Sequence, residues 1–415
     1  MTTWLGRRQF VAGSIMSAAL ATRSADAEAR HAPRRQVLSF GIQSAGTLAV
    51  ALEQLTTYLL TIPLEAHVES LRVGLANITP TPYRLNGICC CEGTIWDPAP
   101  GANWGYFTFT GTGDEPRAPA QAPQPCEVPG NHPAETGAIN VPAIYWSDWM
   151  RYRTNAASGR PQMLLRVLAP PQWMSQTLVG AHGNLADVVP GLRPWTLSVM
   201  QAAGDFVTEP TPPRGAVPAP GTPVMVVQYR SAVPGIEIVI GGDSHLSMFH
   251  TFARQAGIAL STPSLPISTW DAAWGGQPSG TTWPCLDQAI DLGSPSVCVI
   301  QGWTLPGGIG RVGYEQRVRE SAERVLRQGG IPVIVKALPR HLFELPALHA
   351  EWDQANKDLD QLVPGAVLFD GNAYVGDPNR PADWRGDAST DGVHPNVAGN
   401  VLLREPFAAM LRTLL

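Results

Sequence analysis

Apolar and polar residues alternate differently in the two halves of the chain. Before about residue 230, apolar side chains recur at every second position in short runs, namely residues 70–78, 106–110, 163–168 and 224–229. A period of two is typical of strands that bury one face. Stretches rich in proline and glycine separate these runs. The pattern predicts a mainly β region of sandwich or jelly-roll type over residues 36–230.

After residue 230, short apolar runs alternate with amphipathic ones. The short runs predict strands at residues 236–240, 296–301, 331–337 and 366–369. The amphipathic runs predict helices at residues 246–257, 314–328, 347–362 and 396–415, the last with a break near Pro406. Repeated strand–helix units favour a parallel sheet with helices on both faces and a site at the C-terminal ends of the strands. We therefore expect an α/β domain over residues 234–415, preceded by a boundary in the proline-rich residues 210–223.

The strand predicted at residues 236–240 ends in a turn that carries a serine. Two glycines are followed there by Asp243 and Ser244. A serine at such a turn exposes its hydroxyl at the sheet edge, where backbone N–H groups can stabilise developing negative charge. Ser244 is therefore the candidate nucleophile, and Asp243 is expected to brace the turn. His245 and His250 follow closely, but neither has an acid at suitable spacing, so both are predicted to be structural.

A second chemical motif lies shortly before the last predicted helix. Asp391 precedes His394 by three residues, and Pro395 follows. This spacing lets one short loop hold the imidazole against the carboxylate and fix its tautomer. The residue before a proline adopts extended geometry, which places His394 on a loop. Ser244, Asp391 and His394 are thus the predicted nucleophile, orienting acid and base.

The Gly-Asp-Ser turn and the late Asp-x-x-His motif closely resemble those of the SGNH/GDSL hydrolases, over roughly residues 234–415. The resemblance implies a flavodoxin-like α/β fold and serine esterase activity through an acyl-enzyme, with no metal and no cofactor. The first half, around residues 70–85, resembles the β-sandwich module that precedes the hydrolase domain in some secreted members of the family.

The same resemblance implies an oxyanion hole, in which one position departs from the family. Besides the Ser244 N–H, a glycine N–H is expected from Gly276, with Gly275 as the neighbouring choice. The family's asparagine is replaced by Thr304. The third donor is then lost, supplied by the Thr304 hydroxyl, or supplied by Gln301.

Composition limits the partners. The 415 residues favour two or three domains, and with 44% hydrophobic residues large cores are possible. No apolar run after the N-terminus is long enough to span a bilayer, so no stable membrane insertion is expected. A net charge of -5 without a basic cluster disfavours nucleic acid.

The N-terminus resembles a twin-arginine export signal. Arg7 and Arg8 precede a modest apolar stretch, and a small-x-small cleavage site ends at Ala27. Residues 1–27 are therefore predicted to direct export to a bacterial periplasm or beyond. The alternative is an ordinary amphipathic N-terminal helix.

Export would place the six cysteines in an oxidising compartment. Their even split between the halves suits disulfides, and a bond between Cys285 and Cys298 is predicted. Pairing among Cys89, Cys90, Cys91 and Cys126 cannot be read from the sequence. The alternative is six reduced, buried thiols.

The sequence as a whole predicts an exported esterase that hydrolyses short acyl or O-acetyl esters, with a small ester or an acylated glycan as substrate. One alternative is a periplasmic O-acyltransferase with the same triad. Another is a catalytically weak glycan-binding protein, suggested by the missing asparagine. Aromatic residues of the first half could stack on sugar rings: Trp96, Trp104, Tyr106, Tyr145, Trp146 and Trp149.

Overall fold

The computed structural model describes residues 31–42, 46–95, 98, 103–111, 113–131, 142–155, 160–179, 183–207, 209, 213–275, 279–304 and 309–415. The predicted export signal, residues 1–27, lies outside these ranges. No helix of the described part is long and apolar enough to cross a membrane.

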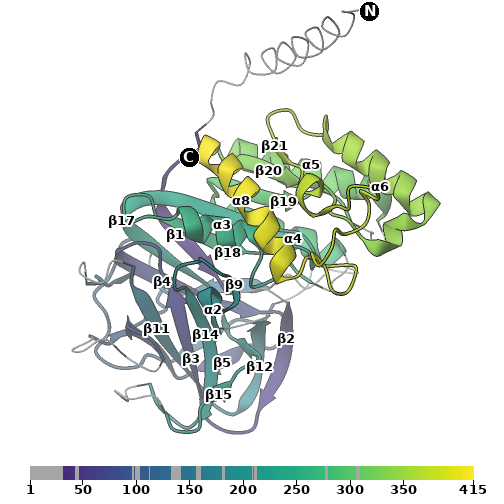
Figure 1. The fold of residues 1–415 in the computed structure, drawn as a ribbon. Coiled ribbons are helices and arrows are strands. Elements are labelled where there is room, and N and C mark those ends of the chain that lie inside the picture. The colour runs from purple at the N-terminus through teal and green to yellow at the C-terminus, as the bar shows by residue number, and fades with distance from the viewer. Residues whose placement is uncertain are drawn as a thin grey trace, which may run out of the picture.

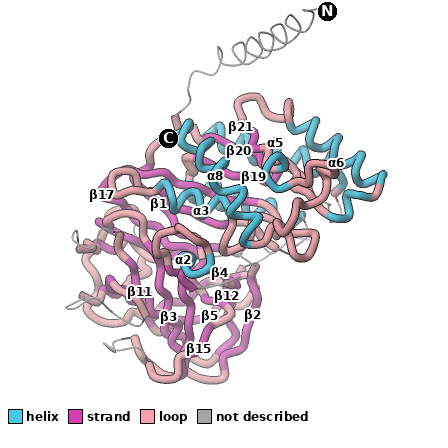
Figure 2. The backbone as a smooth tube through the Cα atoms, viewed as in Figure 1, coloured by secondary structure: helices cyan, strands magenta, loops and turns pink. Residues whose placement is uncertain are grey.

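The first half is built almost entirely of strands (Figure 2). Their bounds, with one short helix, are β1 Arg35–Gly41, β2 Thr47–Leu52, β3 Thr56–Pro63, β4 Val68–Asn77, β5 Tyr83–Leu85, β6 Gly87–Glu92, β7 Gly105–Tyr106, β8 Cys126–Val128, β9 Ala143–Trp146, β10 Met150–Arg151, β11 Gln162–Ala169, β12 Gln172–Leu178, β13 Gly183–Asn184, α2 Leu185–Val188, β14 Thr196–Ala203, β15 Val217–Pro218 and β16 Gly221–Thr222.

The second half alternates strands and helices. The bounds are β17 Val224–Gly241, α3 Phe252–Leu260, β18 Ile267–Asp271, α4 Ser279–Gly293, β19 Val297–Gln301, α5 Gly310–Arg327, β20 Ile331–Val335, the 3-10 helix η2 His341–Glu344, α6 Pro346–Leu359, β21 Val367–Phe369, α7 Asn372–Val375 and α8 Val397–Leu414.

Five strands of the second half form a parallel sheet in the order β18-β17-β19-β20-β21. Counted within this half, the order is 2-1-3-4-5, which is the flavodoxin-like order. Successive residues of β17 face opposite sides: Ile238 packs with α3 and α8, and Val239 packs with α4, α5 and α6. The predicted α/β fold, with a parallel sheet covered by helices on both faces, is confirmed.

The strands of the first half form a β-sandwich. A seven-stranded antiparallel sheet contains β13, β14, β3, β11, β6 and β7, with β15 at its side. It packs against β1, β4 and the first part of β17, and Leu60, Val73, Val167 and Tyr229 all lie in the core between these layers. The mainly β region expected before the α/β part is therefore present (Figure 1).

Strand β17 joins the two regions. Its first part pairs antiparallel with β1 and β4, and its last residues pair parallel with β18 and β19. The sequence predicted two apolar runs here, residues 224–229 and 236–240, and Pro234 lies between them. Pro234 falls between the paired segments, where a missing N–H breaks no ladder hydrogen bond. The expected limits of the two regions, residues 230 and 234, both lie within β17, so the two regions share one sheet.

Helix α8 runs unbroken through Pro406, so the predicted break there is wrong. A proline removes the hydrogen bond to the carbonyl four residues earlier, here that of Leu402. Leu402 lies on the exposed side of the helix, with 38% of its surface accessible, so water can replace the lost donor.

The predicted disulfide between Cys285 and Cys298 is also not formed. All six cysteines lie in the described part of the chain as free, buried thiols. Cys285 belongs to α4, whereas Cys298 is enclosed in the middle of β19. Burial raises the pKa of both thiols, which disfavours the thiolate that disulfide exchange requires.

Candidate active site

The serine turn follows directly from the end of β17 at Gly241. A Cβ added at Gly242 would lie 2.7 Å from the Gln301 Cβ, so only glycine fits where the two strands' ends meet. The Asp243 N–H donates to Gln301 Oε1 at 2.8 Å. Gln301, predicted as a possible oxyanion donor, thus uses its oxygen to hold the turn, and only its Nε2 is left to donate.

Asp243 has the bracing contacts that the sequence suggested. Its Oδ1 accepts from the His245 N–H and from His245 Nδ1, both at 2.9 Å. Burial acts to raise the pKa of Asp243, but the His245 ring, the hydrogen bonds from His245 and the charge of Arg340 hold that pKa well below its usual value. The prediction that His245 has no acid partner is therefore wrong, because the turn folds the ring back onto the carboxylate two residues earlier. The His250 carbonyl accepts from the Gln255 side chain, and His250 Nε2 has no partner in the part of the chain that is described. Burial and, to a lesser degree, the charge of Arg254 lower the pKa of His250.

Ser244, His394 and Asp391 come together in a continuous hydrogen-bonded chain. His394 Nε2 lies 2.7 Å from Ser244 Oγ, and His394 Nδ1 lies 2.7 Å from Asp391 Oδ2. Asp391 Oδ1 also accepts from the N–H groups of Val393 and His394, each at 2.8 Å. Burial acts to raise the pKa of Asp391, but these hydrogen bonds hold it well below its usual value. The carboxylate therefore accepts from Nδ1–H, which leaves Nε2 free to take the serine proton.

The loop that carries His394 is fixed at both ends. Gly392 adopts φ +70°, a conformation that side chains disfavour, and an added Cβ would lie 2.9 Å from that of His341. After Pro395, the Asn396 side chain accepts from the Gly399 N–H and caps α8. The imidazole is thereby held at the start of a long helix.

The structure describes some of the predicted oxyanion donors but not all of them. The Ser244 N–H donates to no described residue. Gly275 follows β18 and lies against Ser244, since an added Cβ would be 3.3 Å from the serine Cβ. Gly276 lies outside the described residues. Thr304 is buried, and its Oγ1 has no hydrogen-bond partner in the described part of the chain.

Arg340 is a site residue that the sequence reading missed. It follows β20, so it lies at the same edge of the sheet as Ser244, and its Nε donates to His245 Nε2 at 3.4 Å. The His245 ring in turn lies 5.3 Å from the His394 ring, between centroids. The sequence feature that could have revealed Arg340 is its position shortly after the strand predicted at residues 331–337.

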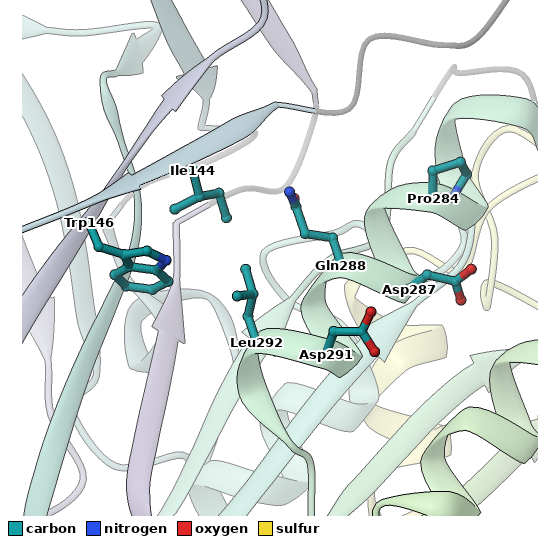
Figure 3. Close-up of a pocket in the computed structure, with 7 residues that line it drawn as sticks. All are labelled: Ile144, Trp146, Pro284, Asp287, Gln288, Asp291 and Leu292. Carbon is teal, nitrogen blue, oxygen red and sulfur yellow. The ribbon is translucent and has the colours of Figure 1, made fainter. Parts of the chain in front are cut away.

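A separate cavity of about 490 Å³ lies between β9 and α4 (Figure 3). Trp146 and Ile144 form one wall, and α4 supplies the other residues: Pro284, Asp287, Gln288, Asp291 and Leu292. No member of the triad lines it. The part of the chain that is described contains no group of three His, Cys, Asp or Glu residues able to hold a metal ion.

The other aromatic residues proposed for sugar stacking are mostly engaged within the protein. Trp149 and Tyr106 are buried. Arg166 covers the Trp104 ring at 4.6 Å, and Tyr145 stacks on Phe109. Trp96 lies outside the described residues.

Comparisons with known proteins find no matching family model and no matching curated protein. Solved structures with a similar fold include TesA, at 17% identity over 43% of this chain and 99% of that chain, with a TM-score of 0.35. A GDSL-like lipase from Bacteroides thetaiotaomicron is 15% identical over 43% of this chain and 88% of that chain, with a TM-score of 0.33. The protein YxiM from Bacillus subtilis is 10% identical over 90% of this chain and 87% of that chain, with a TM-score of 0.31. Of these three, the lipase from Bacteroides thetaiotaomicron has a name of the GDSL type.

Proposed function

We propose that this chain is a serine esterase that hydrolyses carboxylic esters through an acyl-enzyme on Ser244. The observation that carries the proposal is the hydrogen-bonded chain from Ser244 Oγ through His394 to Asp391, with both distances at 2.7 Å. A serine hydroxyl is a poor nucleophile unless an adjacent base takes its proton. In the proposed mechanism His394 is this base, and Asp391 orients its ring and fixes its tautomer.

The geometry suggests the following sequence of steps. His394 Nε2 takes the Ser244 proton as Oγ attacks the ester carbonyl carbon, and the N–H groups of Ser244 and of the Gly275–Gly276 segment stabilise the oxyanion. The His394 imidazolium then gives its proton to the departing alcohol. Water, activated by the same imidazole, attacks the acyl-enzyme and releases the acid. Asp391 keeps the ring oriented in both half-reactions.

The substrates that we propose are esters of short acyl groups, including O-acetyl groups on glycans. Export through residues 1–27 would bring the protein to such substrates outside the cytoplasm. Transfer of the acyl group to a sugar hydroxyl would need the same triad, and the two outcomes differ only in the acceptor.

A panel of 4-nitrophenyl esters of increasing acyl length, combined with a fluorophosphonate probe, tests the proposal. Wild type is expected to hydrolyse the short esters and to be labelled on Ser244, and Ser244→Ala to lose both properties. Labelling should also require His394, which His394→Ala tests. Equal labelling of wild type and Ser244→Ala would refute the nucleophile. Release of nitrophenol that is faster with an added sugar, and yields acylated sugar, would identify an acyltransferase instead.

A further inference from the structure

Backbone hydrogen bonds hold Arg340 close to the loop that carries Asp391 and His394. Its N–H donates to the Ala382 carbonyl at 2.9 Å, and the N–H of the next residue, His341, donates to the Gly392 carbonyl at 2.8 Å. Gly392 belongs to the turn that joins Asp391 to His394. The position of Arg340 is therefore fixed relative to the catalytic loop.

The side chain reaches the serine turn through His245. Asp243 accepts a hydrogen bond from His245 Nδ1, which leaves Nε2 to accept one from Arg340 Nε at 3.4 Å. No hydrogen bond joins Arg340 to Ser244, His394 or Asp391 within the described residues. The guanidinium thus lies next to the reacting centre without being part of the proton-transfer chain.

The charge of Arg340 has no ion-pair partner among the described residues, and its side chain is only partly buried. Burial lowers the pKa of Arg340, and Asp243, Tyr314 and Asp391 oppose this effect. A guanidinium stays charged under such conditions. Its two terminal nitrogens donate to no described residue, and their forked N–H groups match the two oxygens of a carboxylate.

We propose that Arg340 gives this site a preference for esters that carry a second, ionised carboxylate, which its terminal nitrogens bind while Ser244 attacks the ester carbonyl. The proposal rests on the proposed esterase function and adds a substrate class to it. Because the guanidinium contacts His245 and not the triad, the bound carboxylate belongs to a part of the substrate away from the scissile bond. The ester of a dicarboxylic acid or of an acidic alcohol would meet this requirement.

Two matched substrate pairs separate charge from shape. In the first, 3-acetoxybenzoate is compared with 3-acetoxybenzamide, so that the carboxylate lies on the alcohol side. In the second pair, the 4-nitrophenyl monoester of adipate is compared with 4-nitrophenyl heptanoate, so that the carboxylate lies on the acyl side. The kcat/KM ratio of the anionic to the neutral ester is measured in each pair for wild type, Arg340→Met and Arg340→Lys.

We expect wild type to favour the anionic ester in at least one pair. In that pair Arg340→Met should lower the ratio about 10- to 100-fold, the range for a hydrogen bond between charged groups, mainly through KM. Arg340→Lys should retain part of the preference, and Arg317→Met, an exposed arginine on α5, should leave the ratio unchanged. Equal losses for both members of a pair in Arg340→Met, or no preference in wild type, would overturn the inference.

Fluorophosphonate labelling of Arg340→Met checks that the variant is folded. If it does not fold, wild type still decides the question, because kcat/KM for the preferred anionic ester should fall as ionic strength rises while that for its neutral partner should not. Ser244-dependent hydrolysis of the neutral esters without any charge preference would reject this inference alone. Absence of Ser244-dependent hydrolysis of every ester would reject the proposed function itself.

Discussion

At the residue scale, the two oxygens of Asp391 have different tasks. Oδ1 accepts from two backbone N–H groups, and Oδ2 accepts from His394 Nδ1. The two backbone hydrogen bonds to Oδ1 shape the loop, and the hydrogen bond between Oδ2 and Nδ1 fixes the tautomer of His394. Because the carboxylate is about half exposed, with 52% of its side-chain surface accessible, its effect on the ring depends on orientation more than on burial.

Asp391→Asn is therefore expected to lower kcat on 4-nitrophenyl acetate by about 10³- to 10⁴-fold, since an amide in place of Oδ2 can donate to the ring and favour the wrong tautomer. Asp387→Asn, on the exposed segment before the same loop, is the matched control and should have little effect. A loss of less than tenfold in Asp391→Asn would mean that the loop backbone alone orients His394.

Thr304 stands where the resemblance to SGNH/GDSL hydrolases implies an asparagine. Removing its hydroxyl is expected to raise the stability of the protein and to lower its activity. The buried Thr304 hydroxyl has no partner among the described residues, so Thr304→Val should raise the free energy of unfolding by about 1 kcal/mol. If the hydroxyl stabilises the oxyanion, the same variant should lower kcat. Thr304→Asn should raise kcat on an acetyl ester by up to about tenfold, because a longer amide donor restores part of a typical contribution. Unchanged rates in both variants would show that backbone donors suffice.

The residues that the sequence revealed are those with local chemistry. Ser244 follows a strand and two glycines, and Asp391 lies three residues from the imidazole that it orients. Arg340 was missed because it meets His245 across 95 positions of the chain, a proximity that only the sheet order creates. His245 was misread because side chains two residues apart do not face each other on a helix, whereas this turn brings them together.

At the element scale, β17 contains a buried acid that the site does not use. Glu237 is fully buried, its Oε2 accepts from the Ser39 N–H at 2.7 Å, and its Oε1 has no partner among the described residues. Burial raises the pKa of Glu237 well above its usual value, and the hydrogen bonds from Ser39 and the charge of Arg35 only partly oppose this effect. The folded state therefore binds this proton more tightly than the unfolded state does.

The raised pKa gives a definite sign to the pH dependence. The stabilisation is complete below the unfolded pKa of about 4.3 and is lost as pH rises through the folded pKa, by at most about 1.4 kcal/mol per pH unit. Glu237→Gln has no proton to lose, so from pH 5 to pH 7 its free energy of unfolding should rise relative to wild type. Urea denaturation at both pH values measures this difference, and Glu127→Gln, exposed on β8, is the control. If the free energies of unfolding of Glu237→Gln and wild type differ by the same amount at pH 5 and pH 7, the raised pKa of Glu237 is contradicted.

The elements that escaped prediction share a physical cause. All five residues of β18 are buried, but three of them are polar, so no apolar run marks the strand. Their polar atoms have partners from distant segments: Ser268 Oγ donates to the Ser39 carbonyl, and Asp271 pairs with Arg254. Helix α4 contains Pro284, and proline is disfavoured inside a helix, so the local sequence does not mark this segment as helical. Tertiary contacts in both cases override the local pattern.

At the scale of the whole molecule, the two regions are joined by more than β17. Phe249 and Ile258, from the α/β half, lie in the core of the sandwich, and the Phe249 ring packs on Trp195 at 5.7 Å. Buried Glu65 accepts from Arg193 in the sandwich and from Ser261 Oγ at the end of α3. Helix α3 thus packs on the parallel sheet with one side and on the sandwich with the other.

A shared strand and a shared core predict that the two regions unfold together. The free cysteines report on both, because Cys89, Cys90 and Cys91 lie on β6 of the sandwich while Cys285 and Cys298 lie in the α/β half. In a thermal series with a short alkylation pulse, read peptide by peptide by mass spectrometry, all five thiols should become reactive with one midpoint. Loss of Ser244 labelling by the fluorophosphonate should follow the same curve. Alkylation of the β6 cysteines with a midpoint several degrees below that of Cys285 would show instead that β17 joins two independently stable units.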